Sequence, residues 1–279
     1  MSLCLSVWSF ALDFQRRRMD IARFAEVCRT LGVEQVEMVD YFWISAGQPL
    51  SVLRDAGLQI CAYDTATDFV QHDPESRHQQ VQLACAVVEE AIRIGANVVR
   101  LLPGTHKHGV SDEDALQMVV ESVSAVARYA HRAGAIVVLE PHEDVVVSAE
   151  MLRYVAEQVN SAAFGVNADL STFLLHGLDA VRECAAIADL CQRVHLNDMR
   201  RVRKRSQCFR YRSVTGVNYE GTALGDGEID IQRCLHALWT GGFRGPFSVE
   251  YLGMEDAVRG VQRSVANVGK ILQEVETDG

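Results

Sequence analysis

Eight short apolar runs recur along the chain, and longer segments with helical patterning separate them. The runs are rich in Val, Ile, Leu and Phe, which is typical of strands buried on both faces of a parallel sheet. The predicted strands are Leu5–Phe10, Gln35–Val39, Gln59–Tyr63, Val98–Leu102, Ile136–Glu140, Phe164–Asp169, Arg193–Asn197 and Phe247–Tyr251. Because strands that alternate with helices pair in parallel through right-handed crossovers, the pattern predicts an α/β fold, a (β/α)8 TIM barrel.

The segments between these runs carry the end signals of helices. Asp73 and Pro74 supply a capping side chain and then a proline at the first helical position, and Gly95 follows the last turn. Further helices are predicted between Ser111 and Gly134, over Ile231–Trp239 and over Ala257–Val275.

Length and composition agree with one barrel. The chain has 279 residues, of which 48% are hydrophobic and 23% charged, and about 250 residues are typical of such a barrel. No low-complexity linker or composition break interrupts it, so a single domain over residues 1–279 is expected. The longest irregular stretch is predicted from residue 198 to residue 227, and loops of that length are usually functional or disordered.

The net charge of −10 argues against binding to nucleic acid or to a membrane surface. No apolar stretch approaches the roughly 18 residues of a membrane span, and the chain begins with a strand-like run, so no secretory leader is expected. The eight cysteines include no C-x-x-C pair. They are interpreted as buried free thiols, and the protein is expected to be cytoplasmic.

Four potential metal ligands stand at the ends of four successive strand-like runs. They are Glu140 in VVLEPH, Asp169 in FGVNAD, His195 in RVHLND and Glu250 in FSVEYLG. Residues at the carboxyl ends of barrel strands face one shared mouth. Three carboxylates and one imidazole suit one divalent metal ion, Mn²⁺, Mg²⁺, Co²⁺ or Zn²⁺, and the absence of thiolates disfavours a structural zinc site.

These blocks resemble the xylose isomerase-like barrels, the sugar phosphate isomerase/epimerase superfamily. The resemblance covers nearly the whole chain through LEPH around Glu140, the strand ending in Asp169, VHLND around His195, GDGEIDIQRCLHAL from Gly225 and GGFRGPFSVE up to Glu250. It implies one catalytic metal on the four ligands, and Glu140 and Glu250 as the proton-transferring pair. Thr172 stands where the family often has His, which disfavours a DNA-repair endonuclease.

The chemistry is consistent with this ligand set. A hydrogen beside a carbonyl is weakly acidic, and a metal ion stabilises the enediolate that forms on its removal. Return of the proton to the same carbon gives epimerisation, and return to the neighbouring carbon gives aldose–ketose isomerisation. His142, two residues past Glu140, is predicted to bind a substrate hydroxyl or act as an acid; a histidine bonded to a loop carbonyl is the alternative.

Other side chains near the predicted mouth are candidate substrate contacts. They are Trp8, His106, Lys107, Asn197, Arg200 and Arg201. The alternatives are a core aromatic for Trp8, an exposed polar loop for His106 and Lys107, and a turn for Asn197. Arg200 and Arg201 begin a basic loop over residues 200–212 with seven Lys or Arg, which indicates an anionic substrate, because barrels often bind phosphate after strands seven and eight. A subunit contact, a lid or a solvated loop are the alternatives. Arg100 is expected to bridge strand-end carboxylates. Glu37 is expected to join a salt bridge or cap a helix, and a place in the polar floor of the mouth is the alternative.

The leading hypothesis is a divalent-metal-dependent isomerase or epimerase of a sugar, sugar acid or sugar phosphate. The runner-up is a metal-dependent dehydratase of a cyclic polyhydroxy ketone, of the ketoinositol or 3-dehydroshikimate type, which begins with the same proton abstraction. A non-catalytic sugar-binding protein is the alternative from another class. The expected partner is a small carbohydrate or polyhydroxy ketone, with no nucleic acid and no membrane, and a homo-oligomer is left open.

Overall fold

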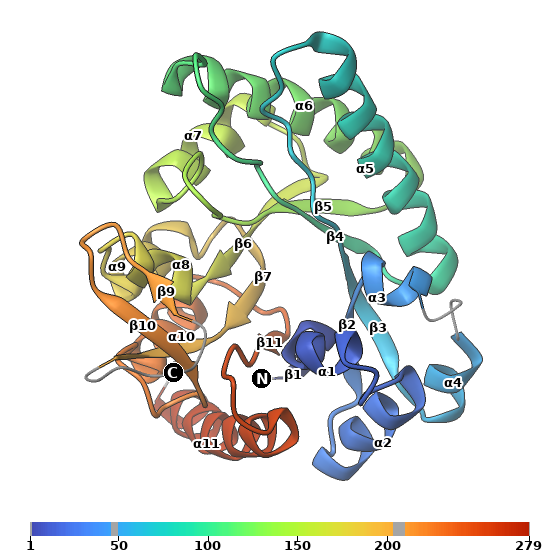
Figure 1. The fold of residues 1–279 in the computed structure, drawn as a ribbon, viewed down its shortest axis with the longest axis vertical. Coiled ribbons are helices and arrows are strands. Elements are labelled where there is room, and N and C mark those ends of the chain that lie inside the picture. The colour runs from blue at the N-terminus through green and yellow to red at the C-terminus, as the bar shows by residue number, and fades with distance from the viewer. Residues whose placement is uncertain (1, 46–49, 203–209, 279) are drawn as a thin grey trace.

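A closed barrel of parallel strands forms the centre of the molecule (Figure 1). The computed structural model describes residues 2–45, 50–202 and 210–278. Within them the barrel order is β1-β11-β7-β6-β5-β4-β3-β2, and β2 pairs back onto β1. The barrel strands are β1 (Leu3–Ser6), β2 (Gln35–Val39), β3 (Gln59–Asp64), β4 (Val98–Leu101), β5 (Ile136–Leu139), β6 (Phe164–Asp169), β7 (Cys191–Leu196) and β11 (Phe247–Val249). The predicted (β/α)8 TIM barrel is confirmed.

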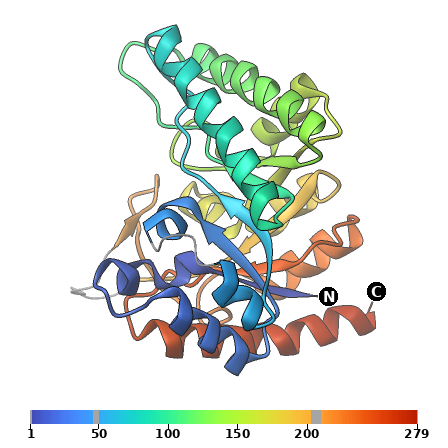
Figure 2. The ribbon, with the colours of Figure 1, turned by 90° about the vertical axis from the view of Figure 1, so that its right-hand side faces the viewer.

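Helices surround the barrel on the outside, and Figure 2 shows α11 alongside α2, where the last helix meets the first part of the chain. The helices are α1 (Ala11–Gln15), α2 (Ile21–Leu31), α3 (Asp40–Ser45), α4 (Leu50–Asp55), α5 (Pro74–Ile94), α6 (Asp112–Ala133), α7 (Ala149–Val159), α8 (Leu170–Leu175), α9 (Ala180–Ile187), α10 (Ile231–Thr240) and α11 (Ala257–Asp278). None of the described helices is long and apolar enough to cross a membrane.

The helix ends follow the predicted capping signals. The Asp73 carboxylate accepts the Ser76 N–H at 2.8 Å, and Gly95 takes a left-handed φ of 92° after the last turn of α5. At α6 the Ser111 hydroxyl accepts the Asp114 N–H at 3.1 Å and donates to the Asp114 carboxylate at 2.7 Å. These bonds satisfy backbone donors that the first helical turn leaves free.

The first strand is shorter than predicted. β1 ends at Ser6, and residues Val7–Phe10 form the 3-10 helix η1 instead of continuing the strand. The Ser6 hydroxyl accepts the Trp8 N–H at 3.3 Å, and such local bonds compete with sheet pairing. The turn directs the chain over the carboxyl end of the barrel, so Trp8 lies beside the mouth.

A small antiparallel sheet occupies part of the stretch predicted to be irregular, which corrects that prediction. It has the order β8-β10-β9 and joins β8 (Asp198–Arg201), β9 (Tyr211–Arg212) and β10 (Asn218–Thr222). The sheet packs on the segment after β11, where Gly221 makes a bridge with Gly253. A Cβ at Gly221 would lie 2.2 Å from the Leu252 carbonyl oxygen, so this approach requires glycine.

The buried carboxylate of Asp198 connects the segment of β8, β9 and β10 to the barrel through hydrogen bonds. One oxygen accepts the N–H groups of Met199 and Ile229 at 2.8 and 3.2 Å, and the other accepts those of Gly225 and Gly227 at 3.0 and 2.8 Å. A Cβ at Gly227 would lie 2.0 Å from the carboxylate. Asp198 therefore joins the end of β7 to the turn that precedes α10.

We expect Asp198→Asn to lower the free energy of unfolding by roughly 2–6 kcal/mol. The new amide cannot accept at its nitrogen, so two buried backbone N–H groups lose their acceptor, each at a cost of about 1–3 kcal/mol. Urea unfolding followed by circular dichroism measures the change. Asp230→Asn is the matched control: Asp230 caps α10 on the surface, and asparagine caps equally well. Equal stability of the two variants would contradict the prediction.

Candidate metal centre

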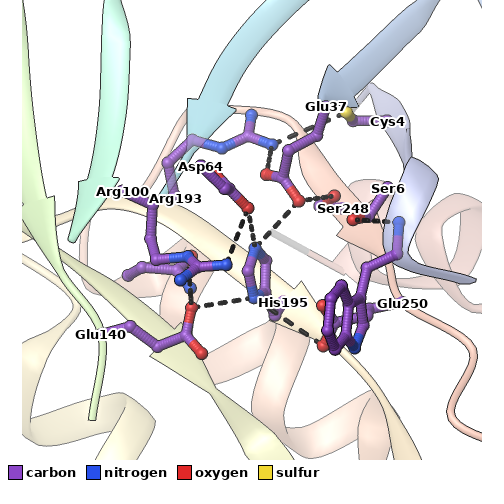
Figure 3. A network of polar contacts seen from close by, with 12 residues as sticks. Cys4, Ser6, Glu37, Asp64, Arg100, Glu140, Arg193, His195, Ser248 and Glu250 are labelled. Atoms are coloured by element: carbon purple, nitrogen blue, oxygen red, sulfur yellow. Dashed lines mark hydrogen bonds and ion pairs between the residues drawn. The ribbon is translucent and has the colours of Figure 1, made fainter. Parts of the chain in front are cut away.

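His195 lies at the centre of a buried group of carboxylates inside the barrel (Figure 3). Its Nδ1 atom is 3.1 Å from Glu140 Oε2, 3.9 Å from Glu250 Oε2 and 4.0 Å from Asp169 Oδ2. The four side chains come from the carboxyl ends of β5, β6, β7 and β11, and each is less than a tenth exposed. The structure thus brings together the four residues that the sequence picks out.

Two further carboxylates lie on the other side of the His195 ring. Glu37 Oε1 is 3.0 Å from Nε2, and Asp64 Oδ2 is 3.8 Å from the same atom. Both side chains are fully buried. Asp64 was not among the predicted site residues, although it stands at the end of the apolar run QICAYD, a signal of the same kind as the one at Asp169.

Two arginines inside the barrel neutralise part of this charge. Arg100 reaches Asp64 at 3.2 Å and Glu140 at 3.1 Å, which confirms the predicted bridge between strand-end carboxylates. Arg193 reaches Glu37 at 2.5 Å, which confirms the predicted salt bridge of Glu37. The cations therefore lie toward Asp64, Glu37 and Glu140, and among the described contacts none reaches Asp169 or Glu250.

The carboxylates outnumber the fixed cations. Two guanidinium groups face five buried carboxylates, which leaves up to three negative charges around His195. The five are Glu37, Asp64, Glu140, Asp169 and Glu250. Burial favours the neutral imidazole, but Glu37, Glu140 and Glu250 raise the pKa of His195 well above its usual value. Buried charge of one sign is costly unless it is neutralised. A divalent cation bound between these oxygens would remove most of the excess.

Burial and neighbouring charges shift the pKa values of three of these carboxylates. Burial, together with the charges of Asp169 and Glu140, raises the pKa of Glu250 to about 7, although His195 acts in the opposite direction. Burial also favours the neutral form of Glu140, but Arg100 and His195 outweigh it and lower its pKa to about 2. Burial and the charge of Glu37 raise the pKa of Asp64 well above its usual value.

The residues present fit a divalent metal ion. His195 Nδ1 is buried and has no hydrogen-bond partner among the described residues, while three carboxylate oxygens face it. A buried nitrogen without a hydrogen-bond partner is available to bind a metal ion. One imidazole nitrogen with three carboxylates matches the donor preference of Mn²⁺, Mg²⁺, Co²⁺ or Zn²⁺.

Two buried amides orient the carboxylates. Asn197 Nδ2 donates to Asp169 Oδ2 at 2.6 Å and to Glu250 Oε2 at 3.1 Å, and its Oδ1 accepts the Ser171 N–H. Asn167 Nδ2 donates to Glu140 Oε2 at 2.8 Å. Asn197, predicted to contact substrate, is fully buried and its polar atoms are occupied by these protein groups.

His142 and Trp8 lie at the edge of the mouth. His142 Nδ1 is 3.9 Å from Glu140 Oε1, and its side chain is 39% exposed. Trp8, Tyr211 and Arg16 line a pocket of about 240 Å³ beside the ends of β1 and β11. Burial and the nearby charges of Glu250 and Asp169 raise the pKa of Tyr211 to about 12, and sequence reasoning missed Tyr211 as a wall of this pocket.

Four other predicted substrate contacts are paired with acidic side chains outside the cluster around His195. The contacts are His106 with Asp112 at 2.8 Å, Lys107 with Asp68 at 2.5 Å, Arg200 with Glu220 at 2.8 Å and Arg201 with Glu228 at 3.1 Å. Arg203, Lys204 and Arg205 of the basic loop lie outside the described residues.

The family model described as the xylose isomerase-like TIM barrel matches residues 25–270. The chain belongs to this family, as its motifs predict. A search of curated proteins finds no match.

Solved structures share the fold along the whole chain. The IolI protein with a bound zinc atom is 16% identical, with a TM-score of 0.81 and coverage of 99% of both chains. An L-ribulose 3-epimerase is also 16% identical, with a TM-score of 0.79 and coverage of 100% of this chain and 97% of the other. The probable 3-DHS dehydratase AsbF of Bacillus anthracis is 13% identical, with a TM-score of 0.73 and coverage of 96% and 99%.

Divalent metal is expected to stabilise the fold. If the centre binds one ion, a free concentration 100-fold above Kd adds about 2.7 kcal/mol to the free energy of unfolding. Asp169→Asn should lose most of this gain, because an amide oxygen is a weaker ligand than a carboxylate. Asp179→Asn is the control, since Asp169 and Asp179 both cap short helices but only Asp169 faces His195. Thermal melts with and without EDTA give the comparison; an equal metal response of both variants would contradict the assignment.

Proposed function

We propose that the protein is a divalent-metal-dependent isomerase or epimerase, which moves a proton at the carbon beside a carbonyl group of a small sugar, sugar acid or sugar phosphate. One observation carries the proposal: three strand-end carboxylates surround an unpartnered, buried imidazole nitrogen at the carboxyl end of a TIM barrel. Membership of the xylose isomerase-like family and the fold shared with an L-ribulose 3-epimerase support it.

Glu140, Asp169, His195 and Glu250 would hold the metal ion. A bound divalent ion supplies Lewis acidity, which polarises a carbonyl oxygen and increases the acidity of the neighbouring C–H bond. The zinc atom in the IolI protein makes Zn²⁺ a candidate beside Mn²⁺, Mg²⁺ and Co²⁺. The described donors are oxygen and nitrogen atoms, which all four metals accept.

Each of the two glutamates contacts the surrounding protein mainly through one of its carboxylate oxygens, Oε2. Glu140 uses Oε2 for Arg100, Asn167 and His195, while its Oε1 is directed to His142. Glu250 uses Oε2 for Asn197 and His195, and its Oε1 has no polar partner in the described part of the chain. Each carboxylate therefore keeps one oxygen that can take or return a proton.

The positions of these glutamates in the barrel suit transfer to either face of a planar intermediate. Glu140 follows β5 and Glu250 follows β11, and β6 and β7 stand between them in the closed sheet. A substrate carbon between them is approached from two directions. Proton return to the original carbon would give an epimer, and return to the adjacent carbon would give an isomer.

A dehydratase acting on a cyclic polyhydroxy ketone is the second candidate. His142 favours it, because its ring nitrogen lies at the exposed side of Glu140 and can protonate a leaving hydroxyl group. The fold shared with the probable 3-DHS dehydratase AsbF supports the same alternative. A non-catalytic sugar-binding protein would hold the ligand without exchanging its protons.

We expect Glu140→Gln and Glu250→Gln each to lower proton exchange by roughly 100- to 10,000-fold at saturating metal, the range for loss of a general acid or base. Substrate and enzyme would be incubated in D2O, and deuterium uptake read by mass spectrometry. Glu143→Gln is the control, because Glu143 contacts His142 but not His195. Metal content is measured for each variant; near-normal exchange in both glutamine variants would refute the proton-transfer roles.

The same assay distinguishes the candidate reactions when ketoses, sugar phosphates, sugar acids, inososes and 3-dehydroshikimate are offered. Deuterium gain without a change in composition supports an isomerase or epimerase. Loss of water selects the dehydratase. Ligand binding without exchange would select the non-catalytic alternative.

The pocket beside the mouth is proposed to hold the part of the substrate that does not react. Its wall combines the half-exposed indole of Trp8 with the ring of Tyr211, and apolar ring faces suit the C–H faces of a sugar. Arg16 at the same pocket can approach an anionic group on the substrate.

Trp8→Ala should raise KM by roughly threefold to tenfold and leave kcat nearly unchanged, because loss of an aromatic contact costs about 0.5–1.5 kcal/mol in binding. Steady-state kinetics on the substrate found by exchange provide the measurement. Ile44→Ala is the control, since Ile44 is a large exposed apolar residue that does not line the pocket. A fall in kcat with unchanged KM would contradict this role of Trp8.

A further inference from the structure

We propose that Glu37 is a positioning residue for His195, and that Arg193 and Ser248 hold the Glu37 carboxylate in place for this purpose. Glu37 would keep a proton on Nε2, so that the lone pair of Nδ1 is directed at the three carboxylates on the opposite side. The inference rests on the proposed metal centre.

The surroundings of the His195 ring differ between its two edges. Nδ1 faces the three strand-end carboxylates that the metal centre would use. Nε2 faces Glu37 at 3.0 Å and Asp64 at 3.8 Å, and the contact with Glu37 lies off the axis of the N–H bond. Acceptor oxygens beside Nε2 favour a proton on that nitrogen, and metal-binding histidines are commonly held by a carboxylate on their second nitrogen.

The Glu37 carboxylate is anchored at both oxygens (Figure 3). Oε1 accepts the Ser248 hydroxyl at 3.2 Å in addition to facing His195, and Oε2 contacts Arg193 Nη2 at 2.5 Å. Glu37 comes from β2, whereas Arg193 and His195 come from β7 and Ser248 from β11. The side chain therefore spans the barrel interior, and it is 0% exposed.

Arg193 is held in its turn by sulfur atoms of the barrel interior. It donates to Cys61 Sγ at 3.4 Å and to Cys4 Sγ at 3.6 Å. Thiols are weak acceptors, and within the described structure Glu37 is the carboxylate that contacts Arg193. The order of contacts runs from the cysteines through Arg193 and Glu37 to the imidazole.

A purely stabilising role explains this arrangement poorly. Branched aliphatic side chains usually fill the interior of a TIM barrel, and replacing a buried ion pair by apolar residues often leaves stability unchanged or increases it. Here the Glu37–Arg193 pair occupies that interior, and Glu37 contacts one edge of the ring of His195, the candidate metal ligand. Orientation of His195 gives the pair a role that apolar side chains would not supply.

Three variants separate positioning from stability: Glu37→Gln, Arg193→Met and the double variant. In each single variant a buried charge or amide lacks a suitable partner, so the midpoint temperature of thermal unfolding should fall. The double variant removes both charges and should recover the midpoint. Zn²⁺ affinity, from competition with a colorimetric chelator at fixed pH, should be roughly 10- to 100-fold weaker in Glu37→Gln and in the double variant. The visible spectrum of the Co²⁺ complex should change in both, because the imidazole is no longer held.

Cys28→Ser is the control, since Cys28 is a fully buried thiol of α2 that has no contact with Arg193, Glu37 or His195 among the described residues. Its Zn²⁺ affinity should stay within about twofold of the wild type. If affinity in the double variant recovers together with the thermal midpoint, Glu37 and Arg193 are only structural and the inference is overturned. Two Zn²⁺ equivalents in the wild type and one in Glu37→Gln would also overturn it, because Glu37 would then be a ligand.

Different outcomes of these measurements would overturn the proposed function and this inference. A wild-type protein that binds no Zn²⁺, Mn²⁺ or Co²⁺ overturns the metal centre and the positioning role with it. A wild type that binds one equivalent, with equal affinity in Glu37→Gln, overturns the positioning role alone and leaves the metal centre in place.

Discussion

The contact of His195 with carboxylates on both edges of its ring is the interaction on which the rest of the site depends. The ring is fully buried, and neither nitrogen has a hydrogen-bond partner in the described part of the chain. Folding therefore concentrates negative charge in a buried place, which is unfavourable unless cations neutralise it. Arg100 and Arg193 supply two of them, and the remaining deficit lies beside Asp169 and Glu250, where a divalent ion would be bound.

The polar interior is arranged so that each charged group has a defined direction. Arg100 forms an ion pair with Glu140 Oε2, and Asn197 donates hydrogen bonds to both Asp169 and Glu250. As a result one carboxylate oxygen of Glu140 and one of Glu250 remain without a contact to Arg100 or Asn197. Preorganisation of this kind needs rigid supports, and the supports here are barrel strands rather than loops. The same logic applies to Glu37, which reaches His195 from across the barrel.

The mouth takes its shape from two segments that depart from the simple barrel. The turn η1 ends β1 early and presents Trp8, and the sheet β8-β10-β9 brings Tyr211 to the same pocket. Asp198 connects this sheet to the end of β7, only three residues from His195. Asp198 therefore links the segment that lines the candidate substrate pocket to the strand that carries His195, a candidate metal ligand.

The sequence by itself determined the eight βα units, the helix caps and the four strand-end residues around His195, because periodicity and capping are local properties of the chain. It also indicated the bridge made by Arg100. It did not reveal Asp64, Tyr211 or the antiparallel sheet, and it assigned Asn197, Arg200 and Arg201 to the substrate. Those features depend on which side chains meet across the closed barrel, and on short strands that pair only because the barrel holds them close. Tertiary structure alone decided that Arg200 and Arg201 are paired with glutamates and that Asn197 is buried between two carboxylates.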